Sequence, residues 1–127
     1  MAFDSQIDKH TLRIDAPELL GENTGVSPKK LLLSSLAGCT GLDVVSLLNK
    51  MKVSFDNFEM DVEADLTNEH PKVYSEIRLV YRFFGEDLNK AKIEKAIALS
   101  KNKYCGVSAM LQKNCPIVYS VEYFKEA

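Results

Sequence analysis

The stretch "GVSPKKLLLSSLAGCTGLDVVSLL" (residues 25–48) decides the fold, because it predicts one long helix. Ser27 followed by Pro28 is typical of a helix start, since a capping hydroxyl precedes a residue that is favoured in the first helical turn. Only two glycines then interrupt the helical pattern before about Met51. The sequence therefore predicts a helix of roughly 24 residues, about 36 Å long at 1.5 Å per residue.

The centre of this predicted helix is built from small residues, whereas its flanks are rich in leucine and valine. Gly38 and Gly41 surround Cys39, and each glycine costs roughly 1 kcal/mol relative to alanine in a helix interior. We expect a compensating contact at this point, such as a crossing helix, a kink or a substrate. Close helix packing and a reactive thiol are both open interpretations of the stretch.

The rest of the chain predicts a mixture of strands and helices. Alternating apolar and polar residues indicate strands over 6–16, 54–67, 72–84 and 117–124. An amphipathic helix is expected over 85–103 with Asp87 as its cap, and a short helix is expected to begin near Tyr104 or Cys105. The predicted fold class is α+β, with the long helix packed on a mainly antiparallel sheet.

The two central strands carry charges of opposite sign on their outer faces. Arg78 and Arg82 in the second strand face an acidic row in the first, formed by Glu59, Asp61, Glu63 and Asp65. Such cross-strand pairs contribute well under about 1 kcal/mol each. We expect them to support the structure of the hairpin rather than to form a binding site.

Length and composition narrow the possible functions. The chain has 127 residues, 46% of them hydrophobic, which suits one domain with a real core over residues 1–127. Its net charge of −2 and scattered lysines predict no nucleic-acid partner. The longest apolar run lies within residues 31–39 and is too short to cross a bilayer, and residues 1–10 lack the features of a secretory signal. We therefore expect a cytoplasmic protein with no membrane partner.

Three cysteines are present, and their spacing matches none of the usual zinc, redox or haem motifs. A framework of structural disulfides is not expected. His10 and His70 each lack a second ligand at a suitable spacing, so we predict no metal site. Cys115 precedes a strand without a basic neighbour and is interpreted as a buried structural residue.

Cys39 and Cys105 are the most suggestive titratable residues, although either alone is more often a small buried hydrophobe than a reagent. Cys105 is placed at a helix N-terminus, where free amides and the helix dipole are expected to lower the thiol pKa. Asp43 lies one turn after Cys39 on the same helix face. It is expected either to share the environment of the thiol or to hydrogen-bond a neighbouring chain.

Together, the long-helix stretch and "ALSKNKYCGVSAML" (residues 98–111) resemble the OsmC/Ohr superfamily, particularly its short YhfA-like branch. The resemblance covers about residues 24–124, and its most specific parts are the "LAGCT" block and the "YC-V---L" block. It implies an intertwined homodimer in which two long helices pack together inside wrapping sheets. The two active sites would lie at the subunit interface.

The resemblance also implies a chemistry that needs no cofactor. Cys39 would be the peroxidatic thiol that reduces an organic hydroperoxide, and Cys105 the resolving thiol that forms a disulfide with it. An external dithiol would then reduce that disulfide. The alternative is a non-enzymatic protein that keeps the fold and either binds a small ligand or assembles with partners in a stress response.

The chain departs from the family pattern at the start of the long helix. Better-known members carry a glutamate soon after the proline, and it holds an arginine that stabilises the thiolate. Here the corresponding positions are Lys29 and Lys30, which oppose the helix dipole and so require exposure or a local anion. Arg13 is the candidate for the missing arginine, with a solvated strand charge as the alternative.

Overall fold

The predicted long helix is present in the structure, a computed structural model that describes residues 2–126. It is α1, which spans Pro28–Lys50 and contains 23 residues. The proline start and the end of the apolar pattern therefore set both boundaries, as the sequence predicted. The chain divides into two units, one up to Ser35 and one from Leu36 onward, and each is described separately.

The first unit contains a small antiparallel sheet and the first turns of α1. Strand β1 (Ala2–Ile7) pairs with strand β2 (His10–Asp15). The prediction of one strand over 6–16 was wrong at its start, because the chain reverses at Asp8. This residue has a φ of 54°, a left-handed conformation that aspartate tolerates in turns.

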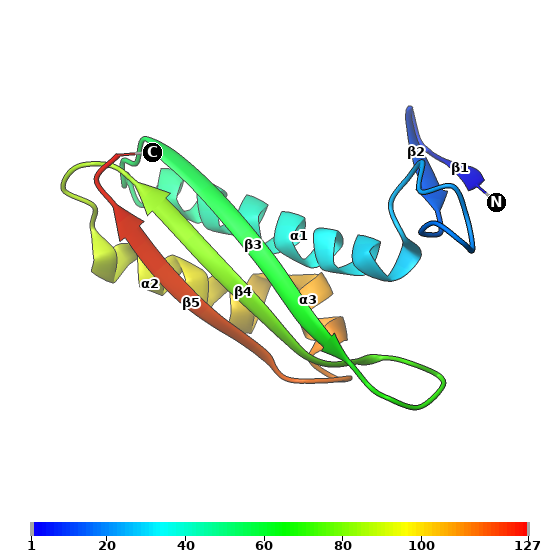
Figure 1. Cartoon of the computed structure of the whole chain (residues 1–127). Helices are drawn as coiled ribbons and strands as arrows, with labels where there is room; N and C mark the ends of the chain where they lie inside the picture. The colour runs from blue at the N-terminus through cyan, green and yellow to red at the C-terminus, as the bar shows by residue number, and fades with distance from the viewer. Residues whose placement is uncertain (1, 127) are drawn as a thin grey trace. The chain divides into compact units, whose positions relative to one another are not determined.

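The second unit is a three-stranded sheet with helices packed on one face (Figure 1). Strands β3 (Asn57–Leu66) and β4 (Tyr74–Phe84) form the predicted antiparallel hairpin. Strand β5 (Ile117–Phe124) pairs with β4 in parallel. The chain crosses over the sheet through its helices before β5 begins, and such a crossover returns a strand in the same direction. With two of three strand pairings antiparallel, the fold is the predicted α+β class.

Three consecutive helical segments make that crossover. They are α2 (Lys90–Leu99), the π-helix η1 (Ser100–Tyr104) and α3 (Gly106–Leu111). The prediction that Asp87 caps the first of them was wrong. The cap is Asn89, whose side-chain oxygen accepts a hydrogen bond from the Lys92 amide at 3.1 Å, while Asp87 adopts a φ of 51° in the turn after β4.

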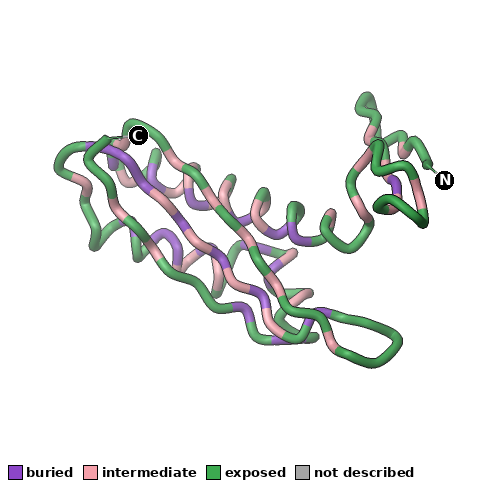
Figure 2. Tube along the Cα trace, in the orientation of Figure 1, coloured by how far each residue is buried: buried purple, intermediate pink, exposed green. Residues whose placement is uncertain are grey.

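The core of the second unit lies between β4 and the helices (Figure 2). Alternate residues of β4 and every fourth residue of α1 face inward, which are the periods expected for a strand and a helix. The buried rows are Ile77, Leu79, Tyr81 and Phe83 in β4, Leu36, Thr40, Val44 and Leu48 in α1, and Ile93, Ala96 and Ile97 in α2.

The two glycines of α1 serve different purposes. A Cβ atom at Gly41 would lie 3.2 Å from Met60 Sδ and 3.6 Å from Phe58 Cε2 on β3, so Gly41 lets the helix approach the sheet closely. A Cβ atom at Gly38 would meet no atom within 4 Å among the described residues. Close packing within the chain therefore explains Gly41 but not Gly38.

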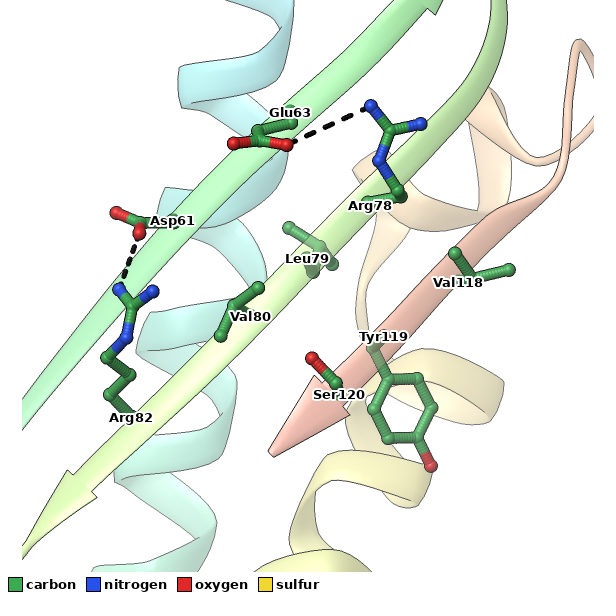
Figure 3. Close-up of a pocket in the computed structure, with 9 residues that line it drawn as sticks. All are labelled: Asp61, Glu63, Arg78, Leu79, Val80, Arg82, Val118, Tyr119 and Ser120. Atoms are coloured by element: carbon green, nitrogen blue, oxygen red, sulfur yellow. Dashed lines mark hydrogen bonds and ion pairs between the residues drawn. The ribbon is translucent and has the colours of Figure 1, made fainter. Parts of the chain in front are cut away.

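The outer face of the sheet carries the predicted charge pairs around a shallow depression of about 330 Å³ (Figure 3). Arg78 Nη1 lies 3.0 Å from carboxylate oxygens of both Asp65 and Glu76. Arg82 Nε lies 2.9 Å from Glu122 Oε1 and also bonds Asp61. Because both guanidinium groups are paired with carboxylates, these pairs support the structure of the hairpin, as predicted, rather than offering free cations to an anion.

Within residues 2–126, α1 is long and apolar enough to cross a membrane, judged by length and composition only. An 18-residue window in it has a mean hydropathy of 1.8. A core helix of a soluble protein meets the same criterion, so this is weak evidence for a membrane span.

Candidate active site

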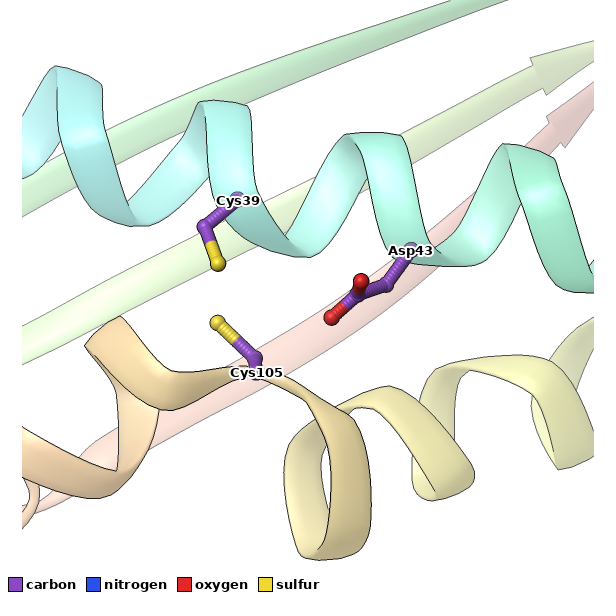
Figure 4. Close-up of side chains that lie close together, drawn as sticks. All are labelled: Cys39, Asp43 and Cys105. Carbon is purple, nitrogen blue, oxygen red and sulfur yellow. The ribbon is translucent and has the colours of Figure 1, made fainter.

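Helix α1 and the residue that precedes α3 bring two cysteines together. Cys39 lies midway along α1, and Cys105 is the N-cap of α3. Their sulfur atoms point toward each other, and Asp43 reaches toward both from one turn further along α1 (Figure 4). The two sulfurs and a carboxylate oxygen all lie within 4.8 Å of one another. Three residues singled out in the sequence thus form one cluster.

The π-helix η1 delivers Cys105 to this position. The Cys105 amide donates a hydrogen bond to the Ser100 carbonyl oxygen at 2.8 Å, which closes the wider turn. Cys105 itself is extended, with a φ of −79° and a ψ of 105°. The π-helix followed by one extended residue separates α2 from α3 and leaves the thiol facing α1. Such widened turns occur frequently at functional sites.

Burial dominates the electrostatics of Cys105, which is only 3% exposed. Burial raises the pKa of its thiol to about 11, and the neighbouring Cys39 and Asp43 act in the same direction. The Ser108 amide donates a hydrogen bond to Cys105 Sγ at 3.3 Å and lowers the pKa, but by less. The predicted lowering of the Cys105 pKa was therefore wrong, because burial outweighs the one amide that α3 directs at the sulfur. Cys105 is a neutral thiol at neutral pH.

Cys39 and Asp43 are more accessible, since both are half-buried. A hydroxyl from η1 orients the carboxylate: Ser100 Oγ lies 3.3 Å from Asp43 Oδ2 in a hydrogen bond that the serine donates. Ser100 is completely buried. Its role was not predicted from the sequence, although Ser100 continues the buried row of Ile93 and Ile97 at helical spacing as a polar residue on an apolar face.

Comparisons with known proteins identify the family of this chain. The sequence model of the OsmC-like protein family matches residues 21–120. Protein YhfA of Escherichia coli K12 is 34% identical over 96 residues, which cover 76% of this chain and 72% of YhfA.

The chain belongs to the OsmC-like protein family.

Solved structures of similar proteins support the fold assignment. A hypothetical protein from Aquifex aeolicus is 29% identical with a TM-score of 0.81, covering 96% of this chain and 88% of that one. An organic hydroperoxide resistance protein, OsmC, from Legionella pneumophila is 21% identical with a TM-score of 0.70, covering 96% and 95%. The predicted family, the predicted similarity to YhfA-like proteins and the predicted OsmC-like fold are confirmed.

Four further residues were singled out in the sequence of this OsmC-like chain. Arg13 belongs to the first unit, where its Nε atom pairs with Asp4 Oδ1 at 2.6 Å, and its role at the site stays a prediction. Lys29 and Lys30 are exposed in the first turn of α1, which satisfies the expectation of exposure. Cys115 is buried, as predicted.

Proposed function

We propose that this protein is a thiol-dependent peroxidase that reduces organic hydroperoxides, with Cys39 as the nucleophile and Cys105 as the resolving thiol. The observation that supports the proposal is the pair of facing sulfurs with unequal exposure. The half-buried Cys39 is accessible to a substrate, whereas the buried Cys105 is held as a neutral thiol. Membership of the family and the likeness to an organic hydroperoxide resistance protein add support.

The reaction proceeds in two steps on these sulfurs. The Cys39 thiolate attacks the terminal oxygen of R–O–O–H, the O–O bond breaks, and the alkoxide leaves as an alcohol after taking up one proton. The product is a sulfenic acid on Cys39. The Cys105 sulfur then attacks the Cys39 sulfur, an S–S bond forms as the S–O bond breaks, and the hydroxide leaves as water with the proton that Cys105 gives up. An external dithiol reduces the disulfide and restores both thiols.

Asp43 is proposed to accept the proton that Cys105 must lose in the second step. A thiol with a pKa near 11 attacks slowly unless a base removes its proton. The carboxylate of Asp43 belongs to the same cluster, within 4.8 Å of the sulfur. The sulfurs, which face each other within 4.8 Å, must then close to about 2.05 Å, the length of a disulfide bond.

The active form is proposed to be a cytoplasmic homodimer with no bound cofactor. Only 28% of the most apolar window of α1 is buried within one chain. Leu42, on the same helix as Cys39, is 76% exposed, and the neighbouring position Gly38 is open. A second copy of α1 that packs against Gly38 and Leu42 would remove apolar surface from water, and Gly38 would permit the two helices to approach closely.

Peptide mass mapping after one equivalent of cumene hydroperoxide tests the proposed function. We expect an intramolecular Cys39–Cys105 disulfide and turnover when dithiothreitol is supplied. Cys39→Ser removes both, Cys105→Ser leaves a sulfenic acid without a disulfide, and Cys115→Ser is the matched control that changes neither. Two free thiols after treatment, with no turnover, would contradict the proposal, and a small-ligand-binding protein would become the better interpretation.

A further inference from the structure

We propose that Cys39, Asp43 and Cys105 also form a binding site for one thiophilic divalent cation, with Zn²⁺ as the best fit. Their ligand atoms converge from α1 and from the residue that precedes α3 (Figure 4). The sequence predicted no metal site, because the three residues are far apart in the chain and match no ligand motif. Only the fold brings them together.

The spacing of the three ligand atoms suits a tetrahedral ion. With a Zn–S distance of about 2.3 Å and a Zn–O distance of about 2.1 Å, tetrahedral ligand atoms are separated by about 3.5–3.8 Å. The three atoms lie within 4.8 Å of one another without an ion. A side-chain adjustment of about 1 Å therefore closes them around the metal.

The donor set selects the kind of ion. Two cysteine sulfurs, which lose their protons on binding the metal, and one carboxylate favour Zn²⁺ over Mg²⁺ or Ca²⁺, which prefer oxygen ligands alone. Three protein ligands leave the fourth tetrahedral position for water or another small ligand, as in zinc sites that are not purely structural. Access from solvent is provided by the half-buried Cys39 and Asp43, while Cys105 closes the inner side.

Two neighbours already hold the ligands in orientations that a metal can use. Ser100 donates its hydroxyl hydrogen bond to Oδ2 of Asp43, which leaves Oδ1 available. The Ser108 amide donates to Cys105 Sγ. Partners of this kind orient metal ligands, and their removal weakens metal binding about 10-fold to 100-fold.

The bound ion would exclude peroxide chemistry at the same sulfurs. A thiolate that binds Zn²⁺ cannot at the same time attack a hydroperoxide or form the Cys39–Cys105 disulfide. Binding itself does not depend on the proposed function, whereas this inhibitory consequence rests on it. The two are therefore tested by separate measurements.

Titration of the fully reduced, anaerobic protein with Co²⁺ tests the site directly. We expect one ion per chain, with sulfur-to-cobalt charge-transfer absorption in the near ultraviolet and the visible bands of tetrahedral Co²⁺, both abolished by added Zn²⁺. Asp43→Asn and Ser100→Ala each leave both thiols in place and are expected to weaken Co²⁺ binding by about 10-fold or more. Cys105→Ser reduces the charge-transfer absorption, and Cys115→Ser, the control, leaves the titration unchanged.

Absence of the charge-transfer absorption in the wild-type protein would overturn the proposed metal site. So would Co²⁺ affinity that is unchanged in Asp43→Asn or Cys105→Ser, with circular dichroism confirming that each variant is folded. Turnover of cumene hydroperoxide is measured in the same preparations. If the protein binds metal but the metal-free form shows no turnover, only the proposed peroxidase function is contradicted. If turnover continues at the full rate with Zn²⁺ bound, the proposal that metal binding and peroxide reduction exclude each other is overturned.

Discussion

Ser100 donates a hydrogen bond to Asp43 across the gap between η1 and α1, with 3.3 Å between Oγ and Oδ2. This contact joins the segment that presents Cys105 to the helix that carries Cys39. It also orients the carboxylate beside the two sulfurs. A buried serine therefore links the fold of the second unit to the geometry of the candidate site.

Replacing Ser100 with alanine should weaken both stability and catalysis. Losing one hydrogen bond to a half-exposed carboxylate should lower the free energy of unfolding by about 0.5–1.5 kcal/mol, measured by urea denaturation. Cys39–Cys105 disulfide formation should slow, because Asp43 loses its orientation. Ser54→Ala changes an exposed serine between α1 and β3 and should leave both close to wild type. An unchanged disulfide rate in Ser100→Ala would argue against a role for this contact in catalysis.

Ionisation of Cys105 should make the reduced protein less stable in alkali. Its thiol pKa is about 11 in the folded chain against 9.0 for the ordinary group, mainly because of burial. Between these values the folded state holds more protons than the unfolded state, so the free energy of unfolding must fall as pH rises. Urea denaturation at pH values from about 8 to about 11 should show this fall in the wild type and less of it in Cys105→Ala. Equal slopes for the two proteins would show that burial does not disfavour the thiolate.

The sequence was sufficient to predict what depends on local pattern. The boundaries of α1 followed from Ser27, Pro28 and the apolar run, and the hairpin charges followed from strand alternation. Helical spacing alone placed Asp43 beside Cys39. These features need only neighbours along one helix or across one turn.

What the sequence did not predict depends on tertiary packing. The lowered pKa expected for Cys105 assumed an exposed helix N-terminus, but the core of the second unit buries the sulfur. The π-helix and the role of Ser100 could not be predicted, because they depend on the packing of α2 and η1 against α1. The sequence shows that Ser100 is a polar residue on an apolar face but does not show which group it contacts. The prediction that Cys39 and Cys105 act as a pair came from the family resemblance and not from their spacing in the sequence.

Acid should loosen the connection between β2 and α1 through Asp15. Its carboxylate accepts hydrogen bonds from the amides of Ala16, Glu22 and Thr24, and from the Thr24 hydroxyl. The Thr24 bonds are the main reason that its pKa is lowered to about 2. The stabilisation is therefore fully present above about pH 4 and is lost as pH falls toward 2.

Amide chemical shifts of Thr24 and Glu22, followed by NMR during an acid titration, should report this transition. Asp15→Asn should expose both amides to faster hydrogen exchange at neutral pH. Asp8→Asn is the matched control, because asparagine also tolerates the left-handed conformation of that turn. A titration midpoint near 4 would show that the hydrogen bonds do not favour the charged carboxylate.

A charge at Leu42 should separate the proposed dimer without unfolding the chain. Leu42 is 76% exposed, so Leu42→Asp disturbs little within one copy, but it would place a carboxylate in the apolar contact between two copies of α1. Sedimentation velocity should show a shift from dimer to monomer, with circular dichroism unchanged. Ala91→Asp adds the same charge to the exposed face of α2 and should remain dimeric. A Leu42→Asp protein that stays dimeric would place the contact on another surface, because a buried, unpaired carboxylate costs several kcal/mol.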